Sequence, residues 1–216
     1  MTPSKASPSV PFPPRQERSR EKLERVLAAV EELLREQLFE ALSMAEIAEH
    51  AGVSVGTIYT RFRAKDELLP ALFARHQAVV GSRVAPFVEE LARQRTLRGR
   101  IDMIVAFAVD YHHEHKGLLR ALTMYVRANP DGVPARAFRE RAAQFRAVAA
   151  VVVGDGRGVK RKDPVEAAEF VLGVVNSVCR EQVLFDDVTP LRGRRRSLAS
   201  LKRRLAAIVH RDLTGR

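Results

Sequence analysis

The sequence predicts an all-α protein, and three features of the chain carry this prediction. Apolar residues recur at the three- and four-residue spacing of amphipathic helices through most of the 216 residues. No stretch shows the sustained alternation of apolar and polar residues that marks a strand. Clusters of Asn, Asp, Gly and Pro interrupt the helical pattern, as connections between helices do. Four short helices in the first 80 residues, followed by longer ones, indicate a small N-terminal domain and a larger helical domain.

The composition is that of a globular protein. Hydrophobic residues make up 46% and charged residues 29% of the chain, which is enough apolar material for a sizeable core. The single cysteine, Cys179, lies in an apolar stretch and cannot form an internal disulfide, which indicates a reducing compartment. No apolar run approaches the roughly 20 residues that span a bilayer, and the N-terminus lacks the apolar core of a signal peptide. We therefore expect a cytoplasmic protein without a membrane partner.

The net charge of +11 does not by itself indicate where nucleic acid would bind. Between residues 15 and 65, nine Lys and Arg balance nine Asp and Glu. Between residues 192 and 216, nine basic residues stand against Asp212 alone. We interpret this basic C-terminal segment as a solvated loop and helix face, with a second DNA-contacting patch as the alternative.

The first 42 residues divide into a tail, a helix and a connection. Residues 1–14 hold five prolines among serines and a threonine, a composition that cannot bury a core and predicts a disordered tail. From Arg18 to about Gln37, apolar residues recur every three or four positions between charged ones, which predicts an amphipathic helix. Residues 39–42 follow as a short connection.

Residues 43–62 have the signals of two short helices joined by a tight turn. Ser43 and Glu46 form a capping-box pattern, which starts the first of them. Gly52 marks a left-handed turn that ends it, and Ser54 offers the N-cap of the next, over residues 55–62. This is a helix-turn-helix, a motif that places its second helix in the major groove of DNA. The residues predicted to pack the motif together are Ile47, Ala48, Val53, Ile58 and Phe62, and those predicted on or near its outer face are Val55, Gly56, Thr57, Thr60 and Arg61.

A fourth helix opens at residues 65–67 and presents apolar residues along one face, and longer helices follow it. The spans predicted beyond Pro86 are 87–94, 97–115, 117–128, 134–153, 164–185 and 197–213. We therefore divide the chain into the tail (1–14), a helix-turn-helix DNA-binding domain called the head (15–65), and a helical regulatory and dimerisation domain called the body (66–216).

The run from Ile47 to Tyr59, together with Phe62 and residues 65–69, resembles the DNA-binding signature of TetR-family transcriptional regulators. The resemblance is close from about Arg20 to Phe73, and beyond that it extends only to the run of helices and the length. For Lys65, a charge beside the positive end of a helix adds an argument, because a phosphate would compensate it. The resemblance implies phosphate contacts by Ser43, Ser54, Tyr59 and Lys65, base contacts by Val55, Gly56, Thr57 and Thr60, and either role for Arg61.

The body offers candidates for an effector cavity and for a dimer interface. Aromatic and methionine side chains recur along several predicted helices, either as plain core or as the lining of a ligand cavity. Residues 170–179 are apolar on most sides, which indicates burial on both faces of their helix. The resemblance implies that helices 164–185 and 197–213 form a four-helix bundle with those of a second copy, and a central helix of a monomer is the alternative. The cavity candidates are Met103, Phe107, Tyr111, Met124, Tyr125, Phe138 and Phe145.

Taken together, these features favour a homodimeric DNA-binding transcriptional regulator, a repressor that a small apolar or aromatic effector releases from a palindromic operator. A ligand-independent architectural DNA-binding protein is the alternative, and its binding would ignore the DNA sequence. We expect no enzyme, because the chain has no glycine-rich phosphate loop and no convincing nucleophile pair. We expect no cofactor and no metal either, since His112, His113 and His115 are spaced too closely along a helix to converge on one ion.

Overall fold

The structure is a computed structural model, and it describes residues 15–130, 135–187 and 197–215. Within these ranges the chain is a succession of helices without a strand, as the sequence predicts. Two short 3-10 helices, Phe39–Ala41 and Lys65–Glu67, precede α2 and α4, and a π-helical turn, Arg180–Leu184, extends α8. The predicted tail lies outside the described residues. The α-helices are α1 (Arg15–Leu33), α2 (Met44–Ala51), α3 (Val55–Tyr59), α4 (Leu68–Ala92), α5 (Leu97–Glu114), α6 (Lys116–Ala128), α7 (Ala135–Val153), α8 (Pro164–Cys179) and α9 (Leu198–Thr214).

The prediction that the first helix reaches Gln37 is wrong by its last turn. α1 ends at Leu33. Beyond it, the Arg35 N–H donates to the carbonyl of Glu32 and the Glu36 N–H to that of Leu33, so these hydrogen bonds span three residues instead of the four of an α-helix. Such tighter bonds are a common way to satisfy the free carbonyls at a helix end. The chain thereby turns early enough for Phe39 to enter the core beneath the helix-turn-helix.

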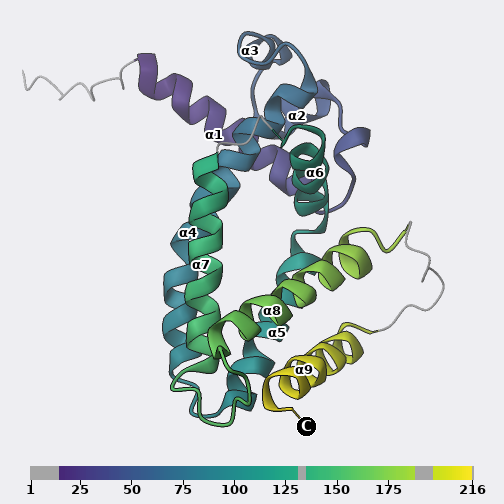
Figure 1. Cartoon of the computed structure of the whole chain (residues 1–216). Coiled ribbons are helices and arrows are strands. Elements are labelled where there is room, and N and C mark those ends of the chain that lie inside the picture. Colours follow the sequence, from purple (N-terminus) through teal and green to yellow (C-terminus); the bar gives the residue numbers. More distant parts are fainter. Residues whose placement is uncertain (1–14, 131–134, 188–196, 216) are drawn as a thin grey trace, which may run out of the picture.

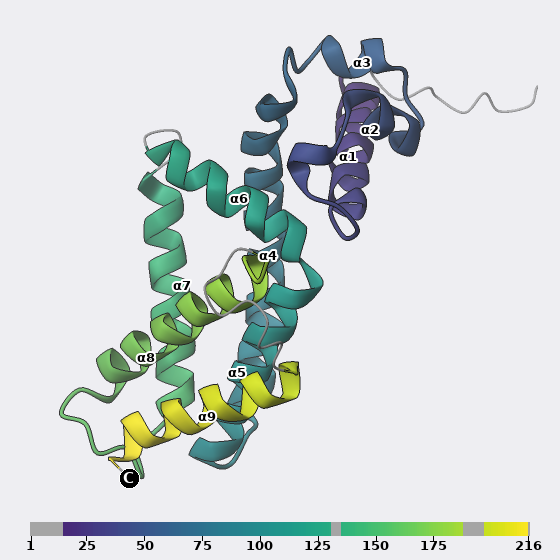
Figure 2. The ribbon, with the colours of Figure 1, turned by 90° about the vertical axis from the view of Figure 1, so that its right-hand side faces the viewer.

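The prediction of a new helix at residue 87 is also wrong, because α4 continues through Pro86. Proline lacks the N–H of one helical hydrogen bond and disfavours a helix interior. Burial compensates for the loss: Leu91 is fully buried, and Phe87 packs against the core of the body. The result is one long helix that begins beneath the helix-turn-helix and ends in the body, and Figures 1 and 2 show its course.

Two hydrophobic cores organise the described residues. The first lies beneath α2 and α3, where α1, the first 3-10 helix and the start of α4 meet, and Val30, Ile47 and Leu72 are fully buried in it. The second fills the body between the end of α4 and helices α5, α7, α8 and α9, around residues such as Val105 and Val175. The helix-turn-helix lies at one end of the molecule and α9 at the other (Figure 1).

Helix α6 belongs to both halves of the molecule. Leu118, Ala121 and Leu122 enter the first core, although they lie far beyond residue 65 in the sequence. At its N-terminus, Lys116 forms an ion pair with Asp186, which follows the π-helical turn of the body. Figure 2 shows α6 between the head helices and α8. None of the described helices has the length and apolarity needed to cross a membrane.

Candidate nucleic-acid interface and effector groove

The helix-turn-helix is fixed locally by the caps that the sequence predicts. Ser43 Oγ accepts a hydrogen bond from Glu46 N–H at 3.1 Å, and the Glu46 carboxylate accepts one from Ser43 N–H at 3.4 Å, which together make a capping box. Gly52 ends α2 with φ of 61°, a left-handed conformation that a side chain would strain. Ser54 Oγ then accepts from Thr57 N–H at 3.2 Å and starts α3. These caps set the angle at which α3 leaves α2.

One face of α3 is buried and the other is open to solvent. Ile58 and, just beyond the helix, Phe62 are 2% and 8% exposed in the first core, which confirms their predicted packing role. Tyr59 is 50% exposed although aromatic side chains are usually buried. The residues that share this open surface with Tyr59 are Ser54, Val55, Gly56, Thr60 and Arg61, and Thr57 lies at its edge, half-buried.

Gly56 has no packing reason to be a glycine. A Cβ built on it would have Ser54 Oγ as its nearest neighbour, at an uncrowded 4.0 Å, and its φ is not positive. Glycine in a helix costs about 1 kcal/mol relative to alanine. The fold therefore does not require a glycine at this exposed position of α3. The missing side chain would let the edge of a base or another backbone approach the helix closely.

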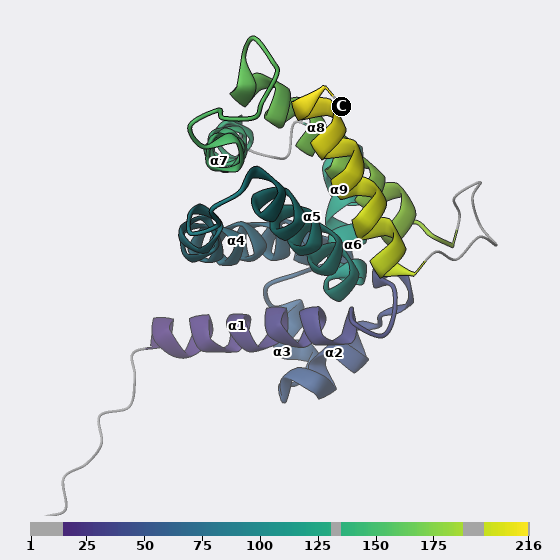
Figure 3. The ribbon, with the colours of Figure 1, turned by 90° about the horizontal axis from the view of Figure 1, so that it is seen from below.

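A basic groove of about 670 Å³ runs between α1 and α3. Arg18 and Lys22 line it from α1, Arg61 lines it from the end of α3, and no acidic side chain contributes to its lining. Figure 3 shows the N-terminal part of α1 extending past α2 and α3. The sequence interpretation missed Arg18 and Lys22, although their spacing of four residues on one helix face was a usable signal.

Several acidic side chains of the head are engaged away from this groove. Glu24 and Glu31 of α1 pair with Arg75 of α4, and Glu32 bonds His50 at 2.8 Å. Glu46 serves the capping box and also accepts a hydrogen bond from Gln37. The head has no net charge over residues 15–65, but the side chains that line the groove are basic. A balanced charge count is therefore compatible with a positively charged groove.

The structure gives the Lys65 side chain backbone partners in place of the phosphate that the sequence suggested. Its Nζ donates to three backbone carbonyls, those of Phe39 at 2.9 Å, Glu40 at 2.8 Å and Leu42 at 2.8 Å. An ammonium group has three N–H donors, and all three are used here. Nζ also lies 5.1 Å from the centre of the Phe39 ring, within range of a cation–π contact. Carbonyl oxygens thus supply the negative partners that we had expected from a phosphate.

A groove of about 1220 Å³ in the body lies between α5, α6, α7 and α8. Its lining includes the apolar side chains of Leu119, Phe145 and Leu184. Two arginines, Arg141 of α7 and Arg180 of the π-helical turn, also line it. A pocket of this size, mostly apolar with a few polar groups, is typical of a small-molecule site.

Of the six predicted cavity residues whose side chains the structure describes, only Phe145 lines this groove. Tyr125 packs against the first core and Met103 against the second. Phe107 and Met124 are 41% and 48% exposed, so the helical spacing that predicted them did not fix which way they face. The side chain of Phe138 lies outside the described residues.

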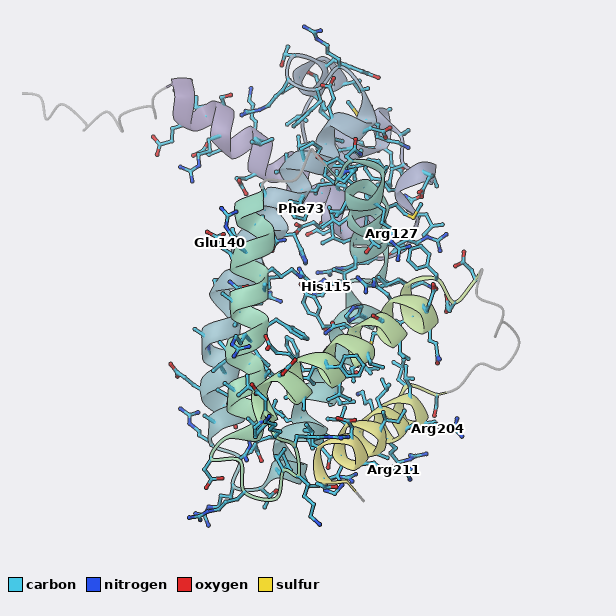
Figure 4. All side chains as sticks on the ribbon, in the orientation of Figure 1. Phe73, His115, Arg127, Glu140, Arg204 and Arg211 are labelled. Atoms are coloured by element: carbon cyan, nitrogen blue, oxygen red, sulfur yellow. The ribbon has the colours of Figure 1, made fainter. Side chains whose placement is uncertain are left out.

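Tyr111 contributes to a second, smaller cavity at the junction of head and body. About 120 Å³ in volume, it is enclosed by α1, α4, α5 and the start of α6. The ring of Tyr111 packs at a tilt against that of His115, with ring centres 4.6 Å apart, and its centre lies 6.2 Å from that of His76. Burial lowers the pKa of His76 to about 4, helped by the positive charge of Arg141, so His76 is neutral near pH 7. Figure 4 shows His115 in the middle of the molecule, between the long helices.

The outer surfaces of α8 and α9 are apolar. Phe170 is 71%, Val174 36% and Ile208 49% exposed, all on helices that pack with their other faces into the second core. A Cβ added to Gly173, between the first two, would meet open space. Arg204 and Arg211 of α9 flank Ile208, and Figure 4 shows their side chains at the periphery of the molecule. Large exposed apolar side chains on neighbouring helices indicate an interaction surface.

The comparisons with known proteins agree with this geometry. Residues 26–72 match the family model of bacterial regulatory proteins of the tetR family, which spans α1, the helix-turn-helix and the start of α4. No curated protein matches the whole sequence closely enough to count as a relative.

Several solved structures share the fold at low sequence identity. A TetR-family transcriptional regulator from Mesorhizobium loti MAFF303099 is similar with a TM-score of 0.64 and 21% identity, over 94% of this chain and 98% of that one. A transcriptional regulator from Rhodococcus sp. Rha1 has a TM-score of 0.62 and 18% identity, over 89% and 96%. The regulator FadR from Bacillus subtilis, solved in complex with stearoyl-CoA, has a TM-score of 0.59 and 16% identity, over 89% and 98%. At these identities the likeness establishes the TetR-like all-α fold.

Proposed function

We propose that this chain, whose residues 26–72 match the tetR family model and whose fold is TetR-like, is a homodimeric repressor that a small molecule releases from a palindromic operator. The observation that carries this proposal is the open face of α3 beside a groove lined by Arg18, Lys22 and Arg61. Sequence would be read by the helix and affinity supplied by the basic groove. The chain acts in this proposal by binding, with no catalytic step.

We assign the DNA contacts by what each side chain offers at the surface. Phosphate contacts come from Ser43, Ser54 and Tyr59, and the structure suggests adding Arg18 and Lys22 while leaving out Lys65. A hydroxyl or a cationic side chain can donate to a phosphate without reading the base sequence. Base contacts come from the exposed start and outer side of α3, with Arg61 serving either role; these residues are Val55, Gly56, Thr57 and Thr60.

The dimer forms in this proposal through the outer faces of α8 and α9. Phe170, Val174 and Ile208 would lose their exposure to water against the same residues of a second copy, as a two-fold interface requires. Phe170 and Val174 also line the body groove, so the second copy would cover that side of the groove. The pair would hold its two reading helices about 34–36 Å apart, which is one turn of DNA and explains a palindromic operator. The division into the head (15–65) and the body (66–216) follows from these two roles.

Helix α6 is the element through which the effector would act. On one side Leu118, Ala121 and Leu122 are buried in the core under the helix-turn-helix. On the other side Leu119 and Thr123 line the body groove. A ligand that contacts Leu119 and Thr123 would favour another position of α6. The head would shift with α6, because the opposite face of this helix is packed into the core of the head. The shift of the DNA-binding equilibrium is limited to the ligand's difference in affinity for the two states.

The similar FadR was solved in complex with stearoyl-CoA. A fold of this kind therefore accommodates a long apolar chain, and the apolar lining of the groove here supports an effector that is apolar over much of its length.

Fluorescence-anisotropy titrations test the proposal. The purified protein is titrated into a duplex from the region upstream of its own gene and into a scrambled duplex, at one near-physiological salt concentration. We expect a preference of about a thousandfold or more, the range of specific over non-specific binding. Arg61→Ala should weaken operator binding, whereas Arg139→Ala, on an exposed position of α7, should leave it unchanged. Equal, weak binding to both duplexes would favour an architectural role instead.

A further inference from the structure

The body groove holds two arginines without a carboxylate partner. None of the ion pairs among the described residues includes Arg141 or Arg180, and the only hydrogen bond of the Arg180 guanidinium goes to the uncharged Ser177 Oγ at 3.2 Å. Arg180 is half-buried, and Arg141 is exposed as a residue although protein atoms surround much of its guanidinium group. A guanidinium in such a site usually finds an anion. The position of these two therefore calls for an explanation.

The two arginines line the groove together with His112. Their positive charges both lower the pKa of His112, and the charge of Arg180 also lowers the pKa of Arg141. Burial is the main cause for each group, so His112 is neutral near pH 7 and adds no charge. Like charges that repel each other within a pocket are stabilised by an anion placed between them.

The acidic residues of the groove do not supply that anion. Glu169 pairs with Arg146 at 2.6 Å, which leaves it neutralised. Glu181 is exposed and forms no ion pair with either arginine. The groove therefore contains two arginines that no carboxylate of its lining pairs with, and it also presents apolar side chains such as Leu119, Phe145 and Leu184.

We propose that the effector of this groove is an amphipathic anion, a chain of several methylenes whose carboxylate or phosphate head binds between Arg141 and Arg180. The regulatory role of the anion rests on the proposed function, but binding of the anion to the groove does not require DNA. Arg180 lies in a π-helical turn, an irregularity of helices that often occurs at functional sites. The turn continues α8 past Cys179 and places Arg180, Glu181 and Leu184 together on the groove.

The test measures calorimetric binding of four probes to the full-length protein in the absence of DNA. Decanoate and decyl phosphate carry the two possible heads, and 1-decanol and decyltrimethylammonium share the chain but are neutral or cationic. We expect one or both anions to bind at least about tenfold more tightly than 1-decanol, because a charge-assisted hydrogen bond contributes that much. Octanoate should bind about sixteenfold more weakly than decanoate, because it lacks two methylenes that contribute about fourfold each.

Three variants locate the head group. Arg141→Gln and Arg180→Gln should each abolish the preference for the anion over 1-decanol while leaving binding of 1-decanol itself unchanged. Arg139→Gln is the matched control on α7, since Arg139 is exposed and does not line the groove, and it should keep the preference. Circular dichroism melting of each variant confirms that it is folded.

Several outcomes would overturn the inference. These are equal binding of decanoate, decyl phosphate and 1-decanol, tighter binding of the cation, no binding of any probe, or the same loss in Arg139→Gln as in the groove variants. Failure of the proposed function looks different: anions would bind as expected, while the protein would show no preference for an operator duplex or would keep its operator when the anion is bound.

Discussion

Replacing Gly117 by alanine tests the contact on which the coupling of body to head depends. Gly117 is the second residue of α6 and lies directly against the end of α1. A Cβ at this position would be 2.0 Å from the carbonyl oxygen of Leu34 and 3.2 Å from that of Gln37. Since such carbon–oxygen contacts are normally about 3.3 Å, α1 and α6 would have to separate by about 1 Å.

The cost of Gly117→Ala follows from this clash. Both groups that collide belong to backbone, so no side chain can rotate away, and overpacking of this kind costs about 1–3 kcal/mol. Alanine returns up to about 1 kcal/mol by restricting the unfolded chain. We therefore expect the free energy of unfolding to fall by about 1–2 kcal/mol, together with weaker operator binding because Leu118 and Leu122 move within the head core.

Urea unfolding at one protein concentration measures this effect, and Gly81→Ala is the matched control. Gly81 lies inside α4, where a Cβ would meet only Gln144 Nε2 at 4.0 Å, so this change should stabilise the protein by about 0.5–1 kcal/mol. If Gly117→Ala proved as stable as the parent protein, or as stable as Gly81→Ala, the close packing of α6 on α1 would be refuted.

Four further predictions follow from single residues. Lys65→Gln should lower the free energy of unfolding by about 1.5–3 kcal/mol, because three carbonyls lose a charged donor; weaker operator binding at unchanged stability, measured by urea unfolding and anisotropy, would restore the phosphate role. Tyr59→Phe should weaken operator binding about five- to tenfold without changing the melting temperature, since the side chain is half exposed and loses one hydroxyl contact; equal affinity by anisotropy would exclude the hydroxyl from the interface. Because burial lowers the pKa of His76 from 6.5 to about 4, the unfolded chain binds this proton more tightly, so the contribution of His76 to stability is complete above about pH 6.5 and falls by up to about 3 kcal/mol as the pH drops toward 4. Urea unfolding across that window should show a smaller loss for His76→Leu, and an identical pH profile would contradict this assignment. Phe170→Glu should give a monomer in light scattering, because it places a charge on the proposed two-fold interface; a dimer that persists would place the interface elsewhere.

Local chemistry made the helix-turn-helix predictable. A capping box depends on two residues three positions apart, and a left-handed helix end depends on one glycine, so Ser43, Glu46 and Gly52 could be recognised without knowledge of distant contacts. The division of α3 into a buried and an exposed face follows from helical periodicity, and Ile58 is buried as that periodicity requires. The DNA-contacting roles of the exposed residues remain predictions.

Long-range contacts decided what the sequence interpretation missed. The sequence suggested that Lys65 binds an anion. In the fold, three backbone carbonyls from residues 39–42 lie within hydrogen-bonding distance of its ammonium group. Pro86 looked like a helix break, and packing of the following residues into the body keeps α4 continuous. The stripe of large residues on α5 predicted a cavity, but Phe107 lies exposed while it stacks on Phe87.

The sequence by itself determined the all-α class, the helix-turn-helix with its caps, and the apolar stripe of α8, because each depends on residues within a few positions of one another. Only the tertiary structure decided that Arg18 and Lys22 line one groove with Arg61 and that Arg141 and Arg180 line another. It also decided that α6 contributes to the core of the head on one side and to the lining of the body groove on the other. Each of these arrangements joins residues far apart along the chain, and their distance in space is set by how whole helices pack rather than by any local pattern.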